Sequence, residues 1–299
     1  MNKKVVVVTG ATGNIGKVMV KKLIDKGYLV RALLRKESEK RWKNEKNIEI
    51  LRGDINDVKV LKKLFEGAYG IIHLAVEMDS ALPWKTFKDV NIDSVKTILE
   101  IAPKTSRLLL ASSVVVYKDT GKEARDETWD LKTTGGVDKY IRSKLLALKM
   151  TRKSKRKVIT VMPSTVIDHE IFGREQLVSN NPLIKWLWNN VGGGIPGGLM
   201  AAVGDRSRIM NFVEVKDVSE GIILALEKGK MGEEYILSGE SLTTGEYLKE
   251  MSKRCGKSYL KIQIPKFFLR LFGIGQVVNM NFSYKKAQKE LGYTPKWKL

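Results

Sequence analysis

Short runs of apolar residues alternate along the first half of the chain with longer segments that mix apolar and charged positions. The apolar runs cover residues 5–8, 29–34, 48–51, 70–74, 108–111 and 158–162. Runs of this length, rich in Val, Ile and Leu, are typical of strands buried on both faces of a parallel sheet. Segments between them, such as Lys17 to Lys26 and Val90 to Ala102, have the spacing of amphipathic helices. The alternation predicts βαβ units and a doubly wound α/β fold.

The pattern changes after Pro163, where a stretch rich in Trp, Asn and Gly runs through residues 185–198. Such loops commonly form the wall of a binding cleft, although an ordinary surface loop fits equally well. A strand-like segment at 211–215, followed by a helical pattern at 217–228, predicts a return to the main sheet. We therefore expect a main domain at 1–165 and a smaller, interleaved C-terminal lobe at 166–299, with 209–238 returning to the sheet.

Composition and charge narrow the class of protein only in part. With 299 residues, 43% hydrophobic and 29% charged, the chain is typical of a folded globular protein of one large or two packed domains. The net charge of +21 attracts anions such as phosphorylated cofactors, nucleic acid or acidic lipid, but selects none of them. We prefer Lys-rich solvated faces to a nucleic-acid surface.

Cysteine and histidine usage argues against disulfides and metal sites. Cys255 has no partner for an internal disulfide, and His73 and His169 are the only histidines, so no metal site is predicted and a reducing cytoplasm is expected. The N-terminal apolar run is too short for a signal-peptide core. The apolar and cationic segment at 264–272 is too short to span a membrane; peripheral membrane contact is an alternative to our preferred interpretation, a helix over the substrate cleft.

A glycine-rich turn follows the first predicted strand directly and opens the first predicted helix. In such a turn, glycines permit a tight bend, close approach of the backbone to a pyrophosphate and close helix–strand packing, while the helix N–H groups face the anion. This context predicts a Rossmann-type dinucleotide site in the main domain. Its predicted contacts are Thr9, Gly10, Thr12, Gly13, Asn14, Ile15 and Gly16.

The end of the second predicted strand indicates which dinucleotide binds. NAD enzymes usually place an acidic residue there, whereas this chain has Arg35 and Lys36. A guanidinium can bind a 2′-phosphate, so NADP is favoured over NAD, with an ordinary surface arginine as the alternative. Asp54, with Ile55 after the third strand, is placed to accept a hydrogen bond from the adenine amino group, or else caps the next helix.

A candidate proton-transfer set lies in two other segments. Tyr140 and Lys144 are four residues apart in a helical pattern, which puts them on one helix face. A free tyrosine has a pKa of about 10, so an ammonium nearby favours the phenolate needed near neutrality. Ser113 follows the apolar strand at 108–111, at the sheet edge where open α/β folds bind ligands. Taken singly, a helix-surface pair and a strand-end cap explain these residues as well.

The chain resembles the extended short-chain dehydrogenase/reductase family in an ordered set of motifs. They are Thr9 to Gly16, His73-Leu74-Ala75, Val90-Asn91, Ser112-Ser113 through Val116-Tyr117, and Tyr140 through Lys144. The resemblance implies that Tyr140 is the catalytic acid/base, that Lys144 supports it and binds the nicotinamide ribose, and that Ser113 binds the substrate oxygen. It also implies cofactor contacts at Leu74, Ala75, Tyr140 and Pro163, and a helix-mediated homodimer as a common arrangement.

Two departures from the family pattern concern the substrate. The segment at 211–218 is similar to the dihydroflavonol-reductase-like and hydroxysteroid-dehydrogenase-like branches. Sugar-nucleotide epimerases often have Arg-Asp where this chain has Met210-Asn211, which disfavours a nucleotide sugar unless Arg206 or Arg208 substitutes. The chain also has Val166-Ile167-Asp168 where the family commonly has Val-Tyr-Gly, so an unusual pocket is expected.

Three hypotheses follow from these observations. The first is an NADP-dependent oxidoreductase acting on a carbonyl or alcohol substrate, an apolar one if Trp186, Trp188 and the 267–272 segment line the site. The second is a nucleotide-sugar epimerase or dehydratase that uses the same residues. The third, a non-catalytic NADP-sensing or nucleic-acid-binding protein, is disfavoured because a pure sensor has no need of Ser113, Tyr140 and Lys144.

Overall fold

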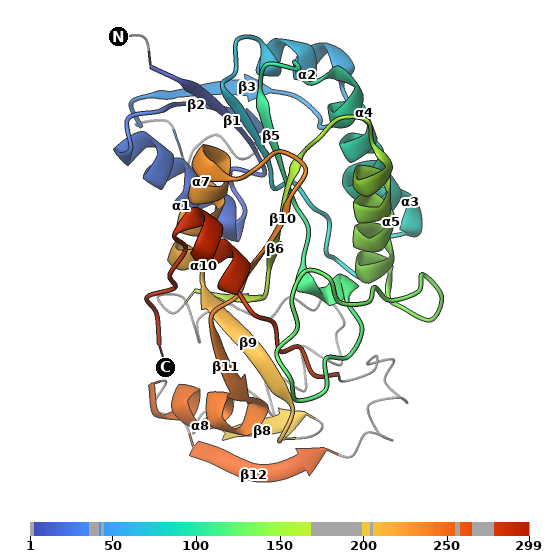
Figure 1. Cartoon of the computed structure of the whole chain (residues 1–299), viewed down its shortest axis with the longest axis vertical. Coiled ribbons are helices and arrows are strands. Elements are labelled where there is room, and N and C mark those ends of the chain that lie inside the picture. The colour runs from blue at the N-terminus through green and yellow to red at the C-terminus, as the bar shows by residue number, and fades with distance from the viewer. Residues whose placement is uncertain are drawn as a thin grey trace.

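Seven parallel strands form the central sheet of the computed structural model, which describes residues 3–35, 42, 45–168, 199–203, 206–254, 258–264 and 278–298. The strand order is β10-β6-β5-β4-β1-β2-β3, so the chain starts in the middle and winds outward in both directions (Figure 1). The strands are β1 (Val5–Thr9), β2 (Leu29–Leu34), β3 (Ile48–Arg52), β4 (Gly70–His73), β5 (Arg107–Ala111), β6 (Ile159–Pro163) and β10 (Glu234–Leu237). The doubly wound, Rossmann-type sheet predicted from the sequence is confirmed.

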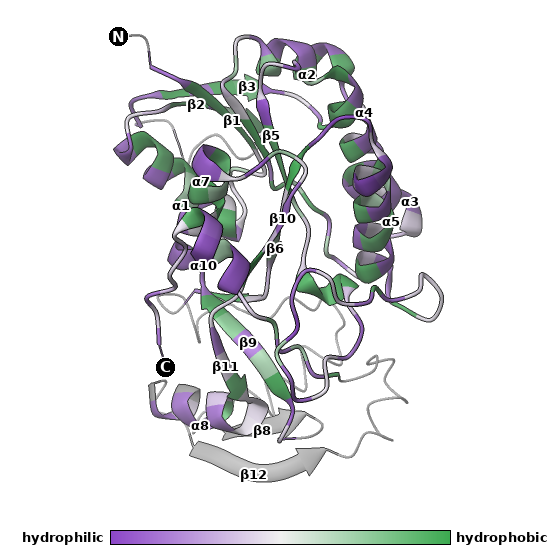
Figure 2. Cartoon of the chain, viewed as in Figure 1, coloured by the Kyte–Doolittle hydropathy of each residue, from purple (hydrophilic) through white to green (hydrophobic). Residues whose placement is uncertain are grey.

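Helices cover both faces of this sheet, which explains why its strands are apolar without interruption. On one face lie α1 (Asn14–Asp25), α7 (Val215–Lys228) and α10 (Lys285–Leu291), and on the other α2 (Val58–Phe65), α4 (Ser94–Ile101) and α5 (Lys139–Lys153) (Figure 1). Val6 and Val8 pack in the core under α1 and α7, whereas Val7 packs in the core under α2 and α4. Figure 2 shows the apolar strands between helices whose outer faces are hydrophilic.

The segment that leads into α4 is irregular. The helix α3 (Trp84–Lys88) continues into a π-helical turn, η2 (Asp89–Asp93), before α4 begins at Ser94. Such π-bulges concentrate at functional sites. Here the bulge places Asn91 in a buried position beside α5.

A smaller lobe lies beyond the carboxyl edge of the main sheet, at the lower end of Figure 1. It contains a three-stranded sheet of β7 (Thr165–Ile167), β9 (Ile209–Glu214) and β11 (Glu240–Thr243), and the helix α8 (Thr244–Arg254). The strands β8 (Leu199–Val203) and β12 (Ser258–Ile264) pair in parallel as a further two-stranded sheet.

One expectation about this lobe is wrong. The strand expected at 211–215 does not rejoin the main sheet, because β9 pairs with β7 in parallel and with β11 in antiparallel orientation. The return is made by α7 and by β10, which pairs with β6. The local sequence of an apolar strand does not predict which sheet the strand joins, because its pairing partners are distant in the sequence.

No helix in the described ranges is long and apolar enough to cross a membrane. Several positions named in the sequence analysis lie outside the described residues. They are the loop at 185–198 with Trp186 and Trp188, Lys36, His169 and Cys255. The helix expected at 264–272 also lies outside them, except for Ile264, which ends β12.

Candidate functional site

The glycine-rich turn has the geometry expected of a close backbone crossing. Gly10 has φ of +73°, and a Cβ there would lie 2.7 Å from the backbone nitrogen of Ala75. A Cβ on Gly16 would lie 2.0 Å from the carbonyl oxygen of Gly10. Gly13 is less crowded, since its Cβ would meet that oxygen at 3.3 Å. Gly10 and Gly16 are thus required by the fold itself, whereas a Cβ on Gly13 would need its neighbour to shift by only a few tenths of an ångström.

Helix α1 begins at this turn without a side-chain cap. Its N-cap is Gly13, and its first turn contains no acidic residue. By contrast, Asp57, Asp138 and Glu214 cap α2, α5 and α7 with side-chain carboxylates. The first N–H groups of a helix attract an anion, and a glycine cap leaves room for one. The start of α1 therefore fits the diphosphate of a dinucleotide.

The ends of β2 and β3 lie side by side at the same edge. Leu34 pairs with Arg52, and the Gly53 backbone N–H donates to the Leu34 carbonyl at 3.2 Å, which brings the exposed Arg35 near Asp54 and Ile55. Asp54 accepts a hydrogen bond from the Asn56 backbone N–H at 2.8 Å. It does not cap α2, because Asp57 does so, and that alternative is wrong.

The residues after β4 close the other side of the turn. Leu74 donates its backbone N–H to the Thr9 carbonyl, and the N–H of Ala75 points to the Thr9 hydroxyl at 3.4 Å. The same hydroxyl lies 2.8 Å from Nδ1 of His73. Burial, aided by the charge of Lys144, lowers the pKa of His73 to about 3, so this imidazole is neutral near pH 7. Sequence reasoning treated His73 as a motif residue and missed its place beside Lys144.

Ser113, Tyr140 and Lys144 meet at the carboxyl edge of β5. Ser113 begins the short 3-10 turn η3 (Val114–Val116), and its hydroxyl forms a side-chain hydrogen bond with Tyr140. Lys144 is only 8% exposed and donates from Nζ to the Ala111 carbonyl at 2.8 Å. The structure thus brings the predicted phenol, ammonium and hydroxyl together from α5 and from the end of β5.

The electrostatics of this group differ from the expectation in one respect. Burial raises the pKa of Tyr140 to about 12, with Asp138 acting in the same direction and the Ser113 hydrogen bond opposing it. Burial also lowers the pKa of Lys144 to about 8. We expected Lys144 to favour the phenolate, but its ammonium is bound to the Ala111 carbonyl and desolvation of the phenol dominates.

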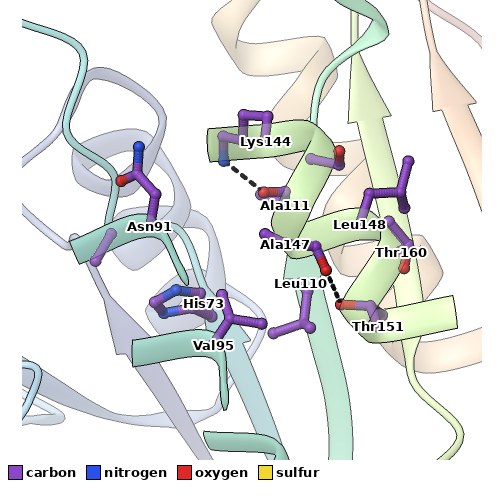
Figure 3. Close-up of a pocket in the computed structure, with 12 residues that line it drawn as sticks. His73, Asn91, Val95, Leu110, Ala111, Lys144, Ala147, Leu148, Thr151 and Thr160 are labelled. Carbon is purple, nitrogen blue, oxygen red and sulfur yellow. Dashed lines mark hydrogen bonds between the residues drawn. The ribbon is translucent and has the colours of Figure 1, made fainter. Parts of the chain in front are cut away.

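A cavity of about 20 Å³ lies behind Lys144, between β4, β5, β6, α5 and the η2–α4 segment (Figure 3). Its polar lining comes from His73, Asn91, Ser112, Lys144, Thr151 and Thr160. The Ser112 hydroxyl is buried there without a hydrogen-bond partner. The volume is enough for one water molecule and far too small for a substrate.

Asn91 joins three elements around this cavity. Its side chain accepts from the Glu77 backbone N–H at 2.7 Å, and donates to the Glu77 carbonyl at 3.0 Å and to the Ser143 hydroxyl at 2.8 Å. The loop after β4 is thereby fastened to the helix that carries Tyr140 and Lys144. The sequence offered Val90-Asn91 as a motif but gave no sign of these contacts.

Pro163 and Asn211, which the sequence analysis singled out for different reasons, are both buried. Pro163 ends β6 and is buried opposite Leu237 of β10. Asn211 has a structural environment, because its amide donates to the Ser241 hydroxyl at 2.8 Å and its carbonyl oxygen accepts from the Phe282 backbone N–H. Asn211 therefore holds the lobe together rather than facing an open site.

Comparisons with known proteins identify the family of the chain. A model described as the NAD dependent epimerase/dehydratase family matches residues 6–238. Sterol demethylase protein B of Methylococcus capsulatus is 26% identical over 86% of this chain and 76% of that protein. A putative dihydroflavonol 4-reductase of Synechocystis is 27% identical over 86% of this chain and 74% of that protein.

Solved structures show the same architecture over nearly the whole chain. The crystal structure of gox2253 has a TM-score of 0.77 at 27% identity, covering 98% of this chain and 94% of that one. A dTDP-glucose 4,6-dehydratase of Bacillus anthracis, in complex with NAD, has a TM-score of 0.76 at 19% identity, covering 98% and 92%. The second likeness establishes the fold alone.

Proposed function

The chain belongs to the NAD dependent epimerase/dehydratase family, and on this premise we propose that it is an NADP-dependent oxidoreductase that transfers hydride between the nicotinamide and a carbonyl or alcohol carbon. The observation that carries the proposal is the meeting of Ser113, Tyr140 and Lys144 at the sheet edge that also holds the glycine-rich turn. Relatives named for dihydroflavonol and sterol chemistry support a ring-bearing, apolar substrate.

The cofactor supplies or accepts the hydride when bound, and the residues of the chain handle the proton. In the reductive direction, the hydroxyl of Ser113 donates a hydrogen bond to the carbonyl oxygen and orients it. Tyr140 then transfers its phenolic proton to that oxygen as negative charge develops. A phenol whose pKa is raised to about 12 is fully protonated near pH 7, which suits this role as proton donor.

Lys144 acts on the phenol after the proton has left. Its ammonium, mostly charged near pH 7 with a pKa lowered to about 8, stabilises the phenolate that the transfer leaves behind. In the structure its ammonium donates to the Ala111 carbonyl, two residues before Ser113, at the strand end where the reacting group would lie. The same groups act in reverse when an alcohol is oxidised.

The assignment of NADP depends on Arg35 and on the absence of an acidic residue at the end of β2 within the described ranges. Arg35 is exposed at the edge where Asp54 and Ile55 also lie, so its guanidinium is available to a 2′-phosphate.

A substrate panel tests the function directly. The purified chain is mixed with NADPH and with aldehydes, dihydroflavonols, sterol ketones and two nucleotide sugars, and NADPH absorbance and sugar products are followed. We expect NADPH consumption with at least one carbonyl compound. Epimerisation or dehydration of a nucleotide sugar, with no consumption on any carbonyl compound, would replace the proposal by the second hypothesis.

A further inference from the structure

An ion pair links the cofactor helix to the substrate lobe. Nζ of Lys17, in the first turn of α1, lies 3.3 Å from Oδ2 of Asp168, directly after β7. The Asp168 side chain is 8% exposed and that of Lys17 25%. With Ile167, Asp168 is one of the two residues at which the chain departs from the Val-Tyr-Gly pattern, and the proposed reaction leaves it without a role.

The position of Lys17 on its helix is unfavourable for a cation standing alone. The N-terminal end of a helix carries partial positive charge, so a lysine in the first turn needs an anion nearby. The first turn of α1 contains no acidic residue. Lys17 therefore depends on anions that come from elsewhere in the molecule or from a ligand.

The direction of the helix brings the Lys17 side chain back to the glycine-rich turn. The Lys17 backbone N–H donates to the Gly13 carbonyl at 3.0 Å, so the two residues lie one helical turn apart on the same face. Side chains on a helix tilt toward its N-terminus. The Lys17 stem thus runs toward Gly13, the least crowded glycine of the turn.

Asp168, the acidic partner of Lys17, lies on the smaller lobe. A buried carboxylate is costly unless a charged or hydrogen-bonding partner accompanies it. It is anchored by β7, which pairs with β9, and therefore belongs to the smaller lobe. Its carboxylate holds the Lys17 ammonium between α1 and the smaller lobe.

We propose that Lys17 is a further ligand for the cofactor diphosphate and that Asp168 is a positioning residue for its ammonium. The inference rests on the proposed dinucleotide site. One ammonium can donate to a phosphate and to Asp168 at the same time, because it carries three N–H donors. Cofactor binding is thereby coupled to the position of the smaller lobe.

Titration calorimetry with NADPH tests Lys17 over a range of NaCl concentrations. Lys17→Met is expected to weaken binding about tenfold, as for the loss of one charge-assisted hydrogen bond, and to make binding less sensitive to salt. Lys21→Met is the matched control, because it removes the same charge from an exposed position one turn further along α1. Lys17→Arg keeps the cation and should bind nearly as well as the wild type.

A double-mutant cycle tests Asp168. Asp168→Asn should weaken NADPH binding several-fold when Lys17 is present, and should not weaken it in the Lys17→Met background, where only a repelling charge is lost. Equal effects in both backgrounds would overturn the positioning role, and equal affinity of Lys17→Met and Lys21→Met would overturn the ligand role. If the wild-type chain itself fails to bind NADPH and NADH, the proposed function fails instead. Thermal unfolding without cofactor checks that each variant is folded.

Discussion

Side chains from two segments far apart in the sequence meet because β5 ends and α5 begins at the same place. Ser113 follows β5, whereas Tyr140 and Lys144 lie on the first turns of α5, which packs across that strand end. Burial shifts the pKa values of two of these side chains: it raises the pKa of Tyr140 and lowers the pKa of Lys144. The protonation states of Tyr140 and Lys144 therefore depend on their burial in the site and not only on the residue types.

Replacement of the phenol tests the proton donor. Tyr140→Phe is expected to lower kcat by about 100- to 10,000-fold, since the proton would have to come from water. NADPH affinity should change little, because the ring and its packing remain. Steady-state kinetics and calorimetry measure the two effects. Tyr284→Phe, which removes a phenolic oxygen from a half-buried ring outside the site, serves as the control. Full turnover by Tyr140→Phe would contradict the mechanism.

Replacement of Arg35 tests the choice of dinucleotide. Arg35→Ala should weaken NADPH binding about tenfold or more, the contribution of a charge-assisted pair to a phosphate, and leave NADH binding unchanged. Fluorescence titration with both dinucleotides measures the ratio. Arg125→Ala, whose guanidinium lies over the Trp129 ring at 4.0 Å, controls for the general loss of one positive charge. Wild-type affinity for NADH equal to that for NADPH, with no effect of the mutation, would refute the assignment.

At the scale of elements, the site depends on how closely the first helix and strand approach each other. Gly16 of α1 lies against Gly10, and Gly10 lies against the backbone after β4, so turn, helix and neighbouring strand are packed without side chains between them. The π-helical turn before α4 adds a second constraint, since Asn91 fastens the loop after β4 to α5. These contacts fix the distance between the glycine-rich turn and the start of α5, which carries Tyr140 and Lys144.

Gly16→Ala tests this close packing. Its Cβ would lie 2.0 Å from the Gly10 carbonyl oxygen, so the helix must shift and the free energy of unfolding should fall by at least about 2 kcal/mol. Gly135→Ala is the control, because a Cβ there meets nothing within 4 Å. It should change stability by less than about 0.5 kcal/mol. Urea unfolding measures both, and equal stabilities would show that the contact is not tight.

At the scale of the whole molecule, the buried ammonium of Lys144 makes stability depend on pH. Its pKa is lowered from 10.5 to about 8, so between these values the unfolded chain binds the proton more strongly than the folded chain. Stability therefore rises with pH through this window. The unfavourable contribution is fully present below about pH 8, where a shift of this size corresponds to about 3 kcal/mol.

Lys144→Met should remove this dependence while abolishing turnover. We expect the mutant to gain stability relative to the wild type at pH 7, and the difference to shrink as the pH rises toward 9.5. Urea unfolding at several pH values measures the difference, which cancels contributions from other titrating groups. A difference that stays constant or grows with pH would show that Lys144 is not desolvated in the folded chain.

The sequence by itself determined what depends on neighbours along the chain. Period and composition identified six strands of the main sheet, all except β10. The glycines between β1 and α1 required a tight turn, and a spacing of four placed Tyr140 and Lys144 on one helix face. These features follow from backbone geometry within a few residues, which local sequence controls. The placement of cofactor roles on these residues stays a proposal, as do the domain limits, the homodimer and the cytoplasmic location.

Only the tertiary structure decided which distant groups meet. It assigned β9 to the smaller sheet, placed His73 and Asn91 around Lys144, and paired Lys17 with Asp168 across the joint between lobe and sheet. It also reversed the expected pKa direction of Tyr140, because desolvation depends on every atom that packs around the phenol. Burial and long-range pairing are sums over contacts between remote segments, and no local pattern in the sequence encodes those sums.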